Sequence, residues 1–135
     1  MKIALISCVK SKRNEECTAK DLYISPLFKM NYAYAKKTCD KIFILSAKYG
    51  LLSETDIIEP YEKTLNKMKI AERKEWAEKV LYELQTKADL QKDKFVILAG
   101  TKYRVDLLPH IKNYEIPFDK FSFGKQLQRL KELIK

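Results

Sequence analysis

The sequence predicts one α/β domain spanning residues 1–135, in which helices flank a mainly parallel sheet in a three-layer arrangement. Three short apolar runs, at residues 3–6, 42–45 and 95–99, have the length and the β-branched or aromatic content of buried strands. Helical segments separate these runs, and strands that alternate with helices form βαβ units with parallel pairing and right-handed crossovers. With one further candidate strand near the C-terminus, the sheet is expected to have about four strands.

The first two strands are expected near the N-terminus. The first covers residues 2–8, and its continuous apolar stretch is typical of a strand that is covered on both faces. A polar loop without periodicity then runs to about Leu22. The second strand, residues 42–45, ends sharply at the polar segment 46–50.

Two of the predicted helices have clear starts or faces. Ser25 and Pro26 predict a helix that runs to about Lys37, because serine is a favoured N-cap and proline suits the first helical position. The longest helix is expected over residues 68–87, with apolar side chains at helical spacing on one face and charged side chains on the other. Asn66 is the candidate cap for this helix.

The last third of the chain predicts shorter elements. A third strand covers residues 94–99, and a short helix that Pro109 ends or bends starts at about Lys102. Residues 114–118 form a candidate fourth strand. Ser122 is expected to cap a final amphipathic helix.

The composition favours a cytoplasmic protein with a basic surface. No run approaches the roughly 18 apolar residues of a membrane helix, and the apolar N-terminal run is too short for a signal peptide, so no membrane association is expected. An odd number of cysteines without metal-type spacing, Cys8, Cys17 and Cys39, indicates a reducing compartment. The net charge of +9 permits a polyanionic partner, although the lysines are spread along the chain as on a generic solvated surface.

All three predicted strands end in polar residues. In a parallel sheet these ends lie along one edge, so the loops that follow them are expected to converge on one site. The loops supply hydroxyl groups, cations, phenols and glycines: Ser7, Lys10 and Lys12 after the first strand; Ser46, Lys48, Tyr49, Gly50, Pro60 and Tyr61 after the second; and Gly100, Thr101, Tyr103 and Arg104 after the third.

The converging residues suit an anionic ligand with a flat ring. Cationic side chains and backbone N–H groups would hold phosphate, and tyrosines would stack on a base. We therefore expect a nucleotide, a modified nucleobase or a nucleic acid as the partner. The structural alternative is that the cations form a solvated turn, that Gly50 and Gly100 serve positive φ angles, and that the tyrosines are half-buried packing residues.

Ser46, Glu59 and Cys8 are the candidate catalytic residues. Pro60 holds Glu59 in an extended conformation and makes it the best candidate for a general acid or base, with an exposed loop carboxylate as the alternative. The two lysines that follow Cys8 would favour its thiolate form, whereas the alternative is a small buried cysteine at a strand end. The single histidine, His110, has no obvious partner, which argues against a Cys/His or Ser/His/Asp mechanism.

No cofactor or metal ion is expected. The glycines fit neither a P-loop nor a GxGxxG pattern, so the sequence does not predict a Walker-type or Rossmann dinucleotide site. No cluster of histidine, cysteine and aspartate has the spacing of metal ligands.

The central segment of the chain carries a family resemblance. Leu45-Ser46-Ala47-Lys48-Tyr49-Gly50-Leu51-Leu52, followed by Asp56-Ile57-Ile58-Glu59-Pro60-Tyr61, is similar to the central motif of the YaaA-like group of small α/β proteins. The N-terminal strand with its serine/lysine loop, and Val96-Ile97-Leu98-Ala99 followed by Tyr103, also match the group. Short members of the group look most similar, with matches at Leu22-Tyr23 and Ser25-Pro26-Leu27-Phe28.

The resemblance implies a shared structural frame made of Ser46, Tyr49, Gly50, Pro60 and Tyr61. The group includes a peroxide-stress protein associated with DNA binding and with protection from oxidative damage, and other relatives occur beside enzymes of 7-deazaguanine modification. It therefore implies nucleobase chemistry or, alternatively, a non-catalytic DNA-binding or stress-response module. A plain interaction domain with a basic surface is the third hypothesis. Lys48 and Glu59 depart from the peroxide-stress protein, so they are expected to tune what this chain binds.

Overall fold

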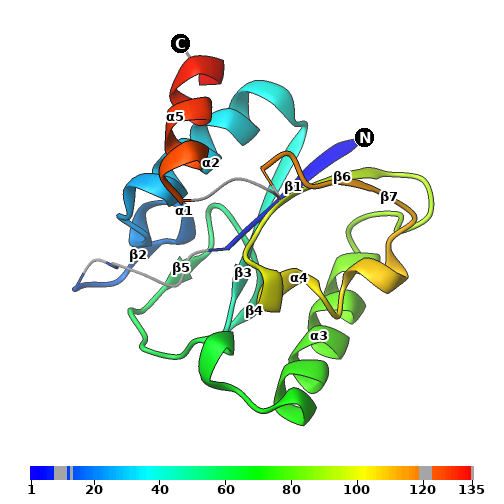
Figure 1. The fold of residues 1–135 in the computed structure, drawn as a ribbon. Helices are drawn as coiled ribbons and strands as arrows, with labels where there is room; N and C mark the ends of the chain where they lie inside the picture. The colour runs from blue at the N-terminus through cyan, green and yellow to red at the C-terminus, as the bar shows by residue number, and fades with distance from the viewer. Residues whose placement is uncertain (8–11, 13, 119–122, 135) are drawn as a thin grey trace.

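The main sheet has five strands in the order β4-β3-β1-β6-β7. The structure is a computed structural model that describes residues 1–7, 12, 14–118 and 123–134. Strands β1 (Lys2–Ser7), β3 (Lys41–Ser46), β6 (Lys94–Leu98) and β7 (Asn113–Glu115) are parallel, and β4 (Gly50–Ser53) pairs antiparallel with β3. Figure 1 shows β1 in the middle of the molecule.

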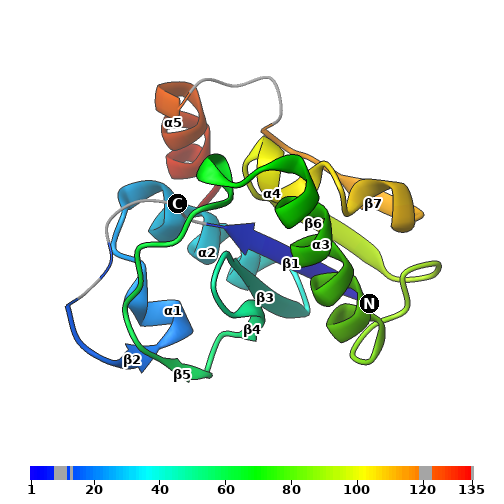
Figure 2. The same ribbon diagram turned by 90° about the horizontal axis from the view of Figure 1, so that it is seen from below.

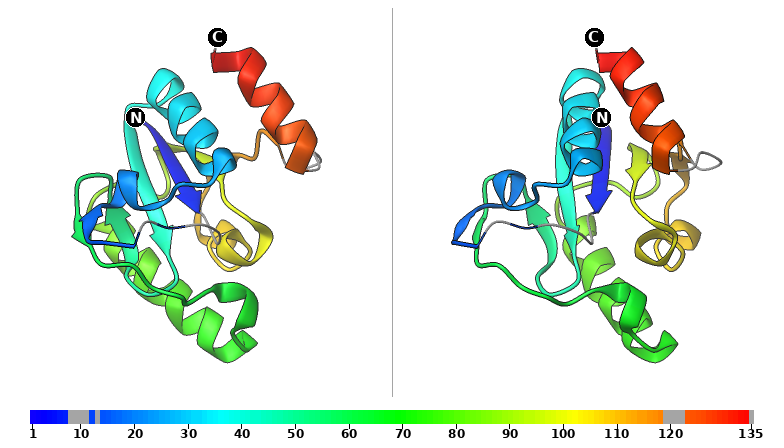
Figure 3. Two further views of the ribbon diagram at one scale, coloured as in Figure 1. Left: turned by 90° about the vertical axis from the view of Figure 1, so that its left-hand side faces the viewer. Right: turned by 60° about the vertical axis from the view of Figure 1, so that its left-hand side comes forward.

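Helices pack against both faces of this sheet. Helices α2 (Pro26–Thr38) and α5 (Phe123–Ile134) contact each other on one side, and α3 (Ile70–Gln85) lies on the other, as Figures 2 and 3 show. The remaining elements are short: α1 (Ala19–Leu22), α4 (Thr101–Arg104), the 3₁₀ turns η1 (Leu65–Lys67) and η2 (Leu108–His110), and a second sheet of β2 (Cys17–Thr18) with β5 (Ile57–Ile58).

The continuous apolar runs form strands because both faces of the sheet are covered. Along β1, Ile3 and Leu5 join the core cluster that contains Trp76 of α3, whereas Ala4 and Ile6 join the cluster that contains Phe28 of α2. Side chains alternate between the two faces of a strand, so a strand with helices on both sides has no polar face to present. The apolar cores on the two faces therefore account for the first strand's sequence.

The observed sheet matches the predicted class and differs in one strand. An α/β fold with a mainly parallel sheet is confirmed, but the sheet has five strands where about four were expected. The additional strand, β4, begins at Gly50 directly after the turn at residues 47–49 and is not among the strands that the sequence predicts. It is only four residues long and depends on pairing with β3, which a local apolar pattern does not reveal.

Several predicted boundaries shift by a few residues. The longest helix covers Ile70–Gln85 within the predicted 68–87, and Lys69 rather than Asn66 is its N-cap. The last strand is Asn113–Glu115 instead of 114–118. The predicted polar loop before Leu22 contains β2 and α1. The proposed Ser122 cap lies outside the described residues.

Candidate functional site

The sheet has a topological switch point between β1 and β6. After β1 the chain crosses over α2 to pair β3 on one side, and it later returns over α3 to place β6 on the other side. The two crossovers place their strands on opposite sides of β1, so a crevice opens at the carboxyl ends of β1 and β6. Open α/β sheets bind their ligands in such crevices.

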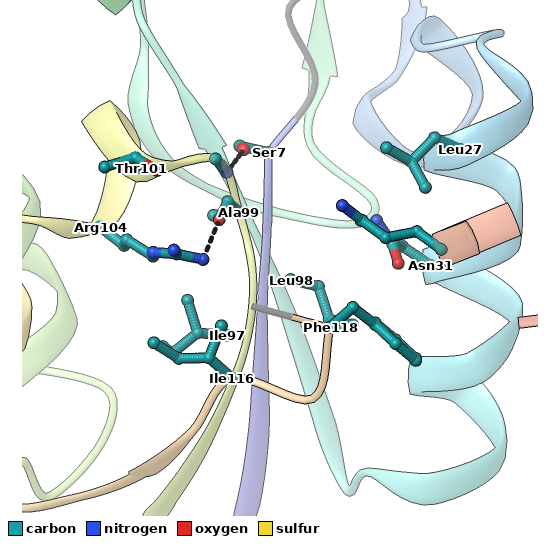
Figure 4. A pocket seen from close by; sticks show the side chains of 12 residues that line it. Ser7, Leu27, Asn31, Ile97, Leu98, Ala99, Thr101, Arg104, Ile116 and Phe118 are labelled. Atoms are coloured by element: carbon teal, nitrogen blue, oxygen red, sulfur yellow. Dashed lines mark hydrogen bonds between the residues drawn. The ribbon is translucent and has the colours of Figure 1, made fainter. Parts of the chain in front are cut away.

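A cavity of about 290 Å³ lies at this position, and we call it the switch-point cavity. Its walls come from the ends of β1 and β6, from α2, α4 and α5, and from the segment after β7. Figure 4 shows α2 on one side of it and α4 on the other. The residues that line it are Ser7, Leu27, Asn31, Ile97, Leu98, Ala99, Gly100, Thr101, Arg104, Ile116, Phe118 and Gln126.

Two hydrogen bonds fix the strand ends that form the floor of the cavity. The backbone N–H of Gly100 donates to Oγ of Ser7 over 3.1 Å, which joins the end of β1 to the segment after β6. The guanidinium of Arg104 donates from Nη1 to the backbone oxygen of Ala99 over 3.2 Å. Arg104 is the one charged side chain among the described lining residues, so it gives the cavity a positive end.

Asn31 is the buried polar group of the opposite wall. It lies in the interior of α2 with 4% of its surface exposed, and its Oδ1 has no hydrogen-bond partner within the part of the chain that the structure describes. Figure 4 places it across the ends of β1 and β6 from Arg104. Most of the other wall residues are apolar, including Leu27, Leu98 and Phe118.

Four further predicted residues, Lys12, Lys48, Tyr49 and Tyr61, lie beside the β3–β4 turn together with Tyr23, and we call these five residues the tyrosine cluster. The rings of Tyr49 and Tyr61 meet edge to face at 5.7 Å, and the hydroxyl groups of Tyr23 and Tyr61 are 2.6 Å apart. Nζ of Lys12 lies 4.7 Å from the centre of the Tyr61 ring, and Nζ of Lys48 lies 5.2 Å from that of Tyr49. These cations therefore sit on aromatic faces.

Within this cluster, the Tyr49 hydroxyl group binds backbone. It donates to the carbonyl oxygen of Glu59 and accepts from the N–H of Glu59, each over 3.3 Å. The Glu59 side chain is exposed and does not line the switch-point cavity, and the next residue, Pro60, is half-buried. The phenol thus fixes the loop that carries Glu59.

Ser46 and Tyr103 lie in the interior of the protein and do not line the switch-point cavity. Ser46 is fully buried, and its Oγ accepts the N–H of Tyr49 over 3.0 Å, while its carbonyl oxygen accepts Nε1–H of Trp76 over 2.8 Å. The hydroxyl group of Tyr103 accepts the N–H of Leu65 over 3.4 Å, and its ring meets Trp76 edge to face at 5.7 Å. Both side chains serve packing and backbone order.

The strand ends therefore divide into two groups. Ser7, Gly100, Thr101 and Arg104 line the switch-point cavity, whereas Lys12, Lys48, Tyr49 and Tyr61 belong to the tyrosine cluster. Gly50 has φ of +80° and forms the β3–β4 turn. Cys8 and Lys10 lie outside the described residues.

Sequence reasoning missed the cavity residues that come from α2, α5 and the segment after β7. Asn31 carried one usable signal, since it is a polar residue four positions after Leu27, where both share a helix face that turns inward. Ile116, Phe118 and Gln126 carried none, because their distance from β1 along the chain is bridged only by the tertiary fold. No group of potential metal ligands occurs among the residues described.

Comparison with protein-family models shows which family the chain belongs to. A model described as a family of unknown function, DUF6884, matches residues 3–132. The chain belongs to this family. No curated protein matches the chain, and neither does any solved structure. Along the described residues, each helix is too short or too polar to cross a membrane.

Proposed function

We propose that this protein binds a nucleotide or a modified nucleobase in the switch-point cavity. The observation that carries the proposal is a crevice at the carboxyl ends of two parallel strands with one cation, Arg104, at one end. An arginine fork suits a phosphate or carboxylate group, because its planar donors match two oxygens at once. The hydroxyl groups of Ser7 and Thr101 lie on the same wall as this cation.

The volume of the cavity limits the ligand. At about 290 Å³, it lies just below the roughly 300–1,000 Å³ that is usual for ligand sites. A single base or nucleoside with a small anionic group is the class that such a space accommodates, whereas a dinucleotide is too large. Apolar walls such as Leu98 and Phe118 suit the faces of a flat ring.

The resemblance to the YaaA-like group supports nucleobase chemistry as part of this proposal. Of the three candidate catalytic residues, Ser46 is buried beside the β3–β4 turn and Glu59 is exposed outside the cavity. A catalytic form of the proposal therefore depends on Cys8, the residue after Ser7 in the chain. A reducing, cytoplasmic setting belongs to the same proposal, because such chemistry needs a free thiol.

A second candidate function is docking of single-stranded nucleic acid on the tyrosine cluster, in a non-catalytic DNA-binding or stress-response role. The observation that favours it is the pair of lysines that lie over tyrosine rings, at the same edge of the sheet as the cavity, in a chain of net charge +9. Cations beside stacking rings are the usual composition of single-strand binding surfaces. In this reading Lys10 adds to the same basic loop.

Calorimetric titration separates the two candidates. Wild type, Arg104→Gln and Lys48→Ala are titrated with mononucleotides, 7-deazaguanine bases and a single-stranded oligonucleotide of about ten nucleotides. Cavity binding predicts that Arg104→Gln weakens mononucleotide affinity by about tenfold or more, while Lys48→Ala leaves it unchanged. Docking on the tyrosine cluster predicts that Lys48→Ala lowers the affinity for the oligonucleotide, and that added salt lowers the affinity of wild type for it. If wild type binds no mononucleotide or base, cavity binding is rejected.

A further inference from the structure

We infer that Asn31 determines the specificity of the switch-point cavity by pairing with a ligand edge that carries an N–H donor beside an acceptor. This inference rests on the proposed function, since it concerns the same cavity. It specifies which group of the ligand lies against the α2 wall, on the side opposite Arg104. The class is a heterocycle with an amide-like or amidine-like edge, joined to an anionic group that reaches Arg104.

Asn31 by itself destabilises the protein. Its position in the interior of α2 is flanked on the same side by buried Phe28 and Ala35, so an apolar residue would suit it. Instead it buries Oδ1, which has no partner among the described residues. Nearly all buried polar atoms in native proteins are hydrogen-bonded, and an unpaired one destabilises the fold. Asn31 lines the cavity, so a rotation of its amide about the Cβ–Cγ bond would bring Oδ1 to a ligand there, and the ligand would supply the missing partner.

The amide of Asn31 can recognise a ring edge that carries a donor beside an acceptor. A side-chain amide offers an acceptor oxygen and an NH₂ donor side by side, so it forms two hydrogen bonds with a ring edge of the complementary pattern. An amino group beside a ring nitrogen has this pattern, and so does a ring N–H beside a carbonyl. A carboxylate or phosphate offers acceptors alone and would leave Oδ1 unpaired.

The cavity has a cation on one side and a neutral amide on the other. Arg104 of α4 and Asn31 of α2 lie on opposite sides of the strand ends in Figure 4, and both line the same space. The apolar side chains of Leu27, Leu98 and Phe118 lie on the walls of the same space. A ligand with an anionic group at one end and a neutral N–H edge at the other complements both ends, and its ring faces complement the apolar walls.

Matched ligand pairs test this inference. Wild type and Asn31→Leu are titrated with AMP and with N6,N6-dimethyl-AMP, and with IMP and its N1-methyl derivative. In each pair, methylation removes the N–H donor and keeps the phosphate. For whichever pair binds, we expect methylation to lower the affinity of wild type by about a hundredfold. We expect Asn31→Leu to lower the affinity for the unmethylated ligand by a similar factor. Methylation should then have little further effect in the variant.

Two outcomes of this experiment overturn the inference. In the first, Asn31→Leu binds the nucleotides and distinguishes methylated from unmethylated ligands as wild type does, while Arg104→Gln loses binding. The proposed function then stands, and the role of Asn31 is rejected. The other is wild type that binds the methylated and unmethylated ligands equally. Asn31→Ala removes both hydrogen-bonding groups without adding bulk or charge, so it serves the same comparison if Asn31→Leu does not fold.

The melting temperature without ligand is an independent readout. If Oδ1 is reserved for a ligand, Asn31→Leu removes an unpaired buried acceptor, and the melting temperature stays equal or rises. The matched control is Asn66→Leu, which changes an exposed asparagine outside the cavity. A clear fall for Asn31→Leu alone would show that the amide is satisfied inside the protein and would overturn the inference, even if no mononucleotide binds.

Discussion

At the scale of single residues, polar side chains at the strand ends divide between backbone support and the cavity. Ser46 and Ser7 both end a parallel strand, and each Oγ accepts one backbone N–H. Ser46 is fully buried beside the β3–β4 turn, whereas Ser7 lines the switch-point cavity. The same residue type at equivalent strand ends thus has different surroundings, which only the neighbouring elements decide.

Replacing Ser46 should affect stability and leave ligand binding unchanged. Ser46→Ala removes the acceptor of the Tyr49 N–H and leaves that partly buried donor without it, so we expect the free energy of unfolding to fall by about 1–2 kcal/mol. Urea denaturation measures this change, and titration measures the affinity for a mononucleotide. Ser7→Ala is the control that lies in the cavity. A loss of affinity without loss of stability in Ser46→Ala would return Ser46 to the ligand site.

At the scale of elements, the β3–β4 hairpin depends on one glycine. Gly50 has φ of +80°, a region that side chains with a Cβ adopt at a cost, and it pairs with Ser46 across the turn. A Cβ at this position would lie 2.9 Å from Oε1 of Glu83 on α3. Gly50 thus permits both the turn and the close approach of the Glu83 side chain to it.

Gly50→Ala should therefore destabilise the domain by about 1–3 kcal/mol, measured by urea denaturation. Gly100→Ala is the matched control, because Gly100 has no positive φ and a Cβ there would meet nothing within 4 Å. We expect the control to stay within about 0.5 kcal/mol of wild type. Equal effects of the two substitutions would argue that the conformation at Gly50 is not what limits the hairpin.

At the scale of the whole molecule, Glu54 links α2 to the segment after β4. Its Oε1 accepts the Tyr32 hydroxyl group over 2.7 Å and lies 3.0 Å from Nζ of Lys36. Burial acts to raise the pKa of Glu54, but the hydrogen bonds from Tyr32 and Lys36 outweigh it and hold this pKa below its ordinary value of 4.5. Burial, together with Glu54 itself, raises the pKa of Tyr32, so the phenol stays a donor at neutral pH.

The sign of the pH dependence follows from the lowered pKa. The folded state binds the Glu54 proton more weakly than the unfolded state, so the contribution of Glu54 is complete above the unfolded value and is lost as the pH falls through the folded one. We expect the difference in unfolding free energy between wild type and Glu54→Gln to shrink as the pH is lowered from about 6 to about 3. Urea denaturation across this range measures it, and a constant difference would contradict the role of the Glu54 charge.

The sequence by itself determined the α/β class and the mainly parallel sheet, because strands covered on both faces must be apolar throughout. It also predicted that polar residues gather at the strand ends, and four of them, Ser7, Gly100, Thr101 and Arg104, line the cavity. Which strand ends meet depends on the crossovers over α2 and α3, which place β6 beside β1 and leave the end of β3 on the far side.

The tertiary structure alone decided the partners of those residues. It placed Ser46 and Tyr103 in the interior of the protein. It also brought Asn31 of α2 to a cavity whose other walls come largely from segments much later in the chain. Local patterns report whether a segment is buried, because burial follows from the periodicity of apolar residues. They do not report which distant segment covers it, because that depends on the order of the strands and on how the helices pack across the sheet.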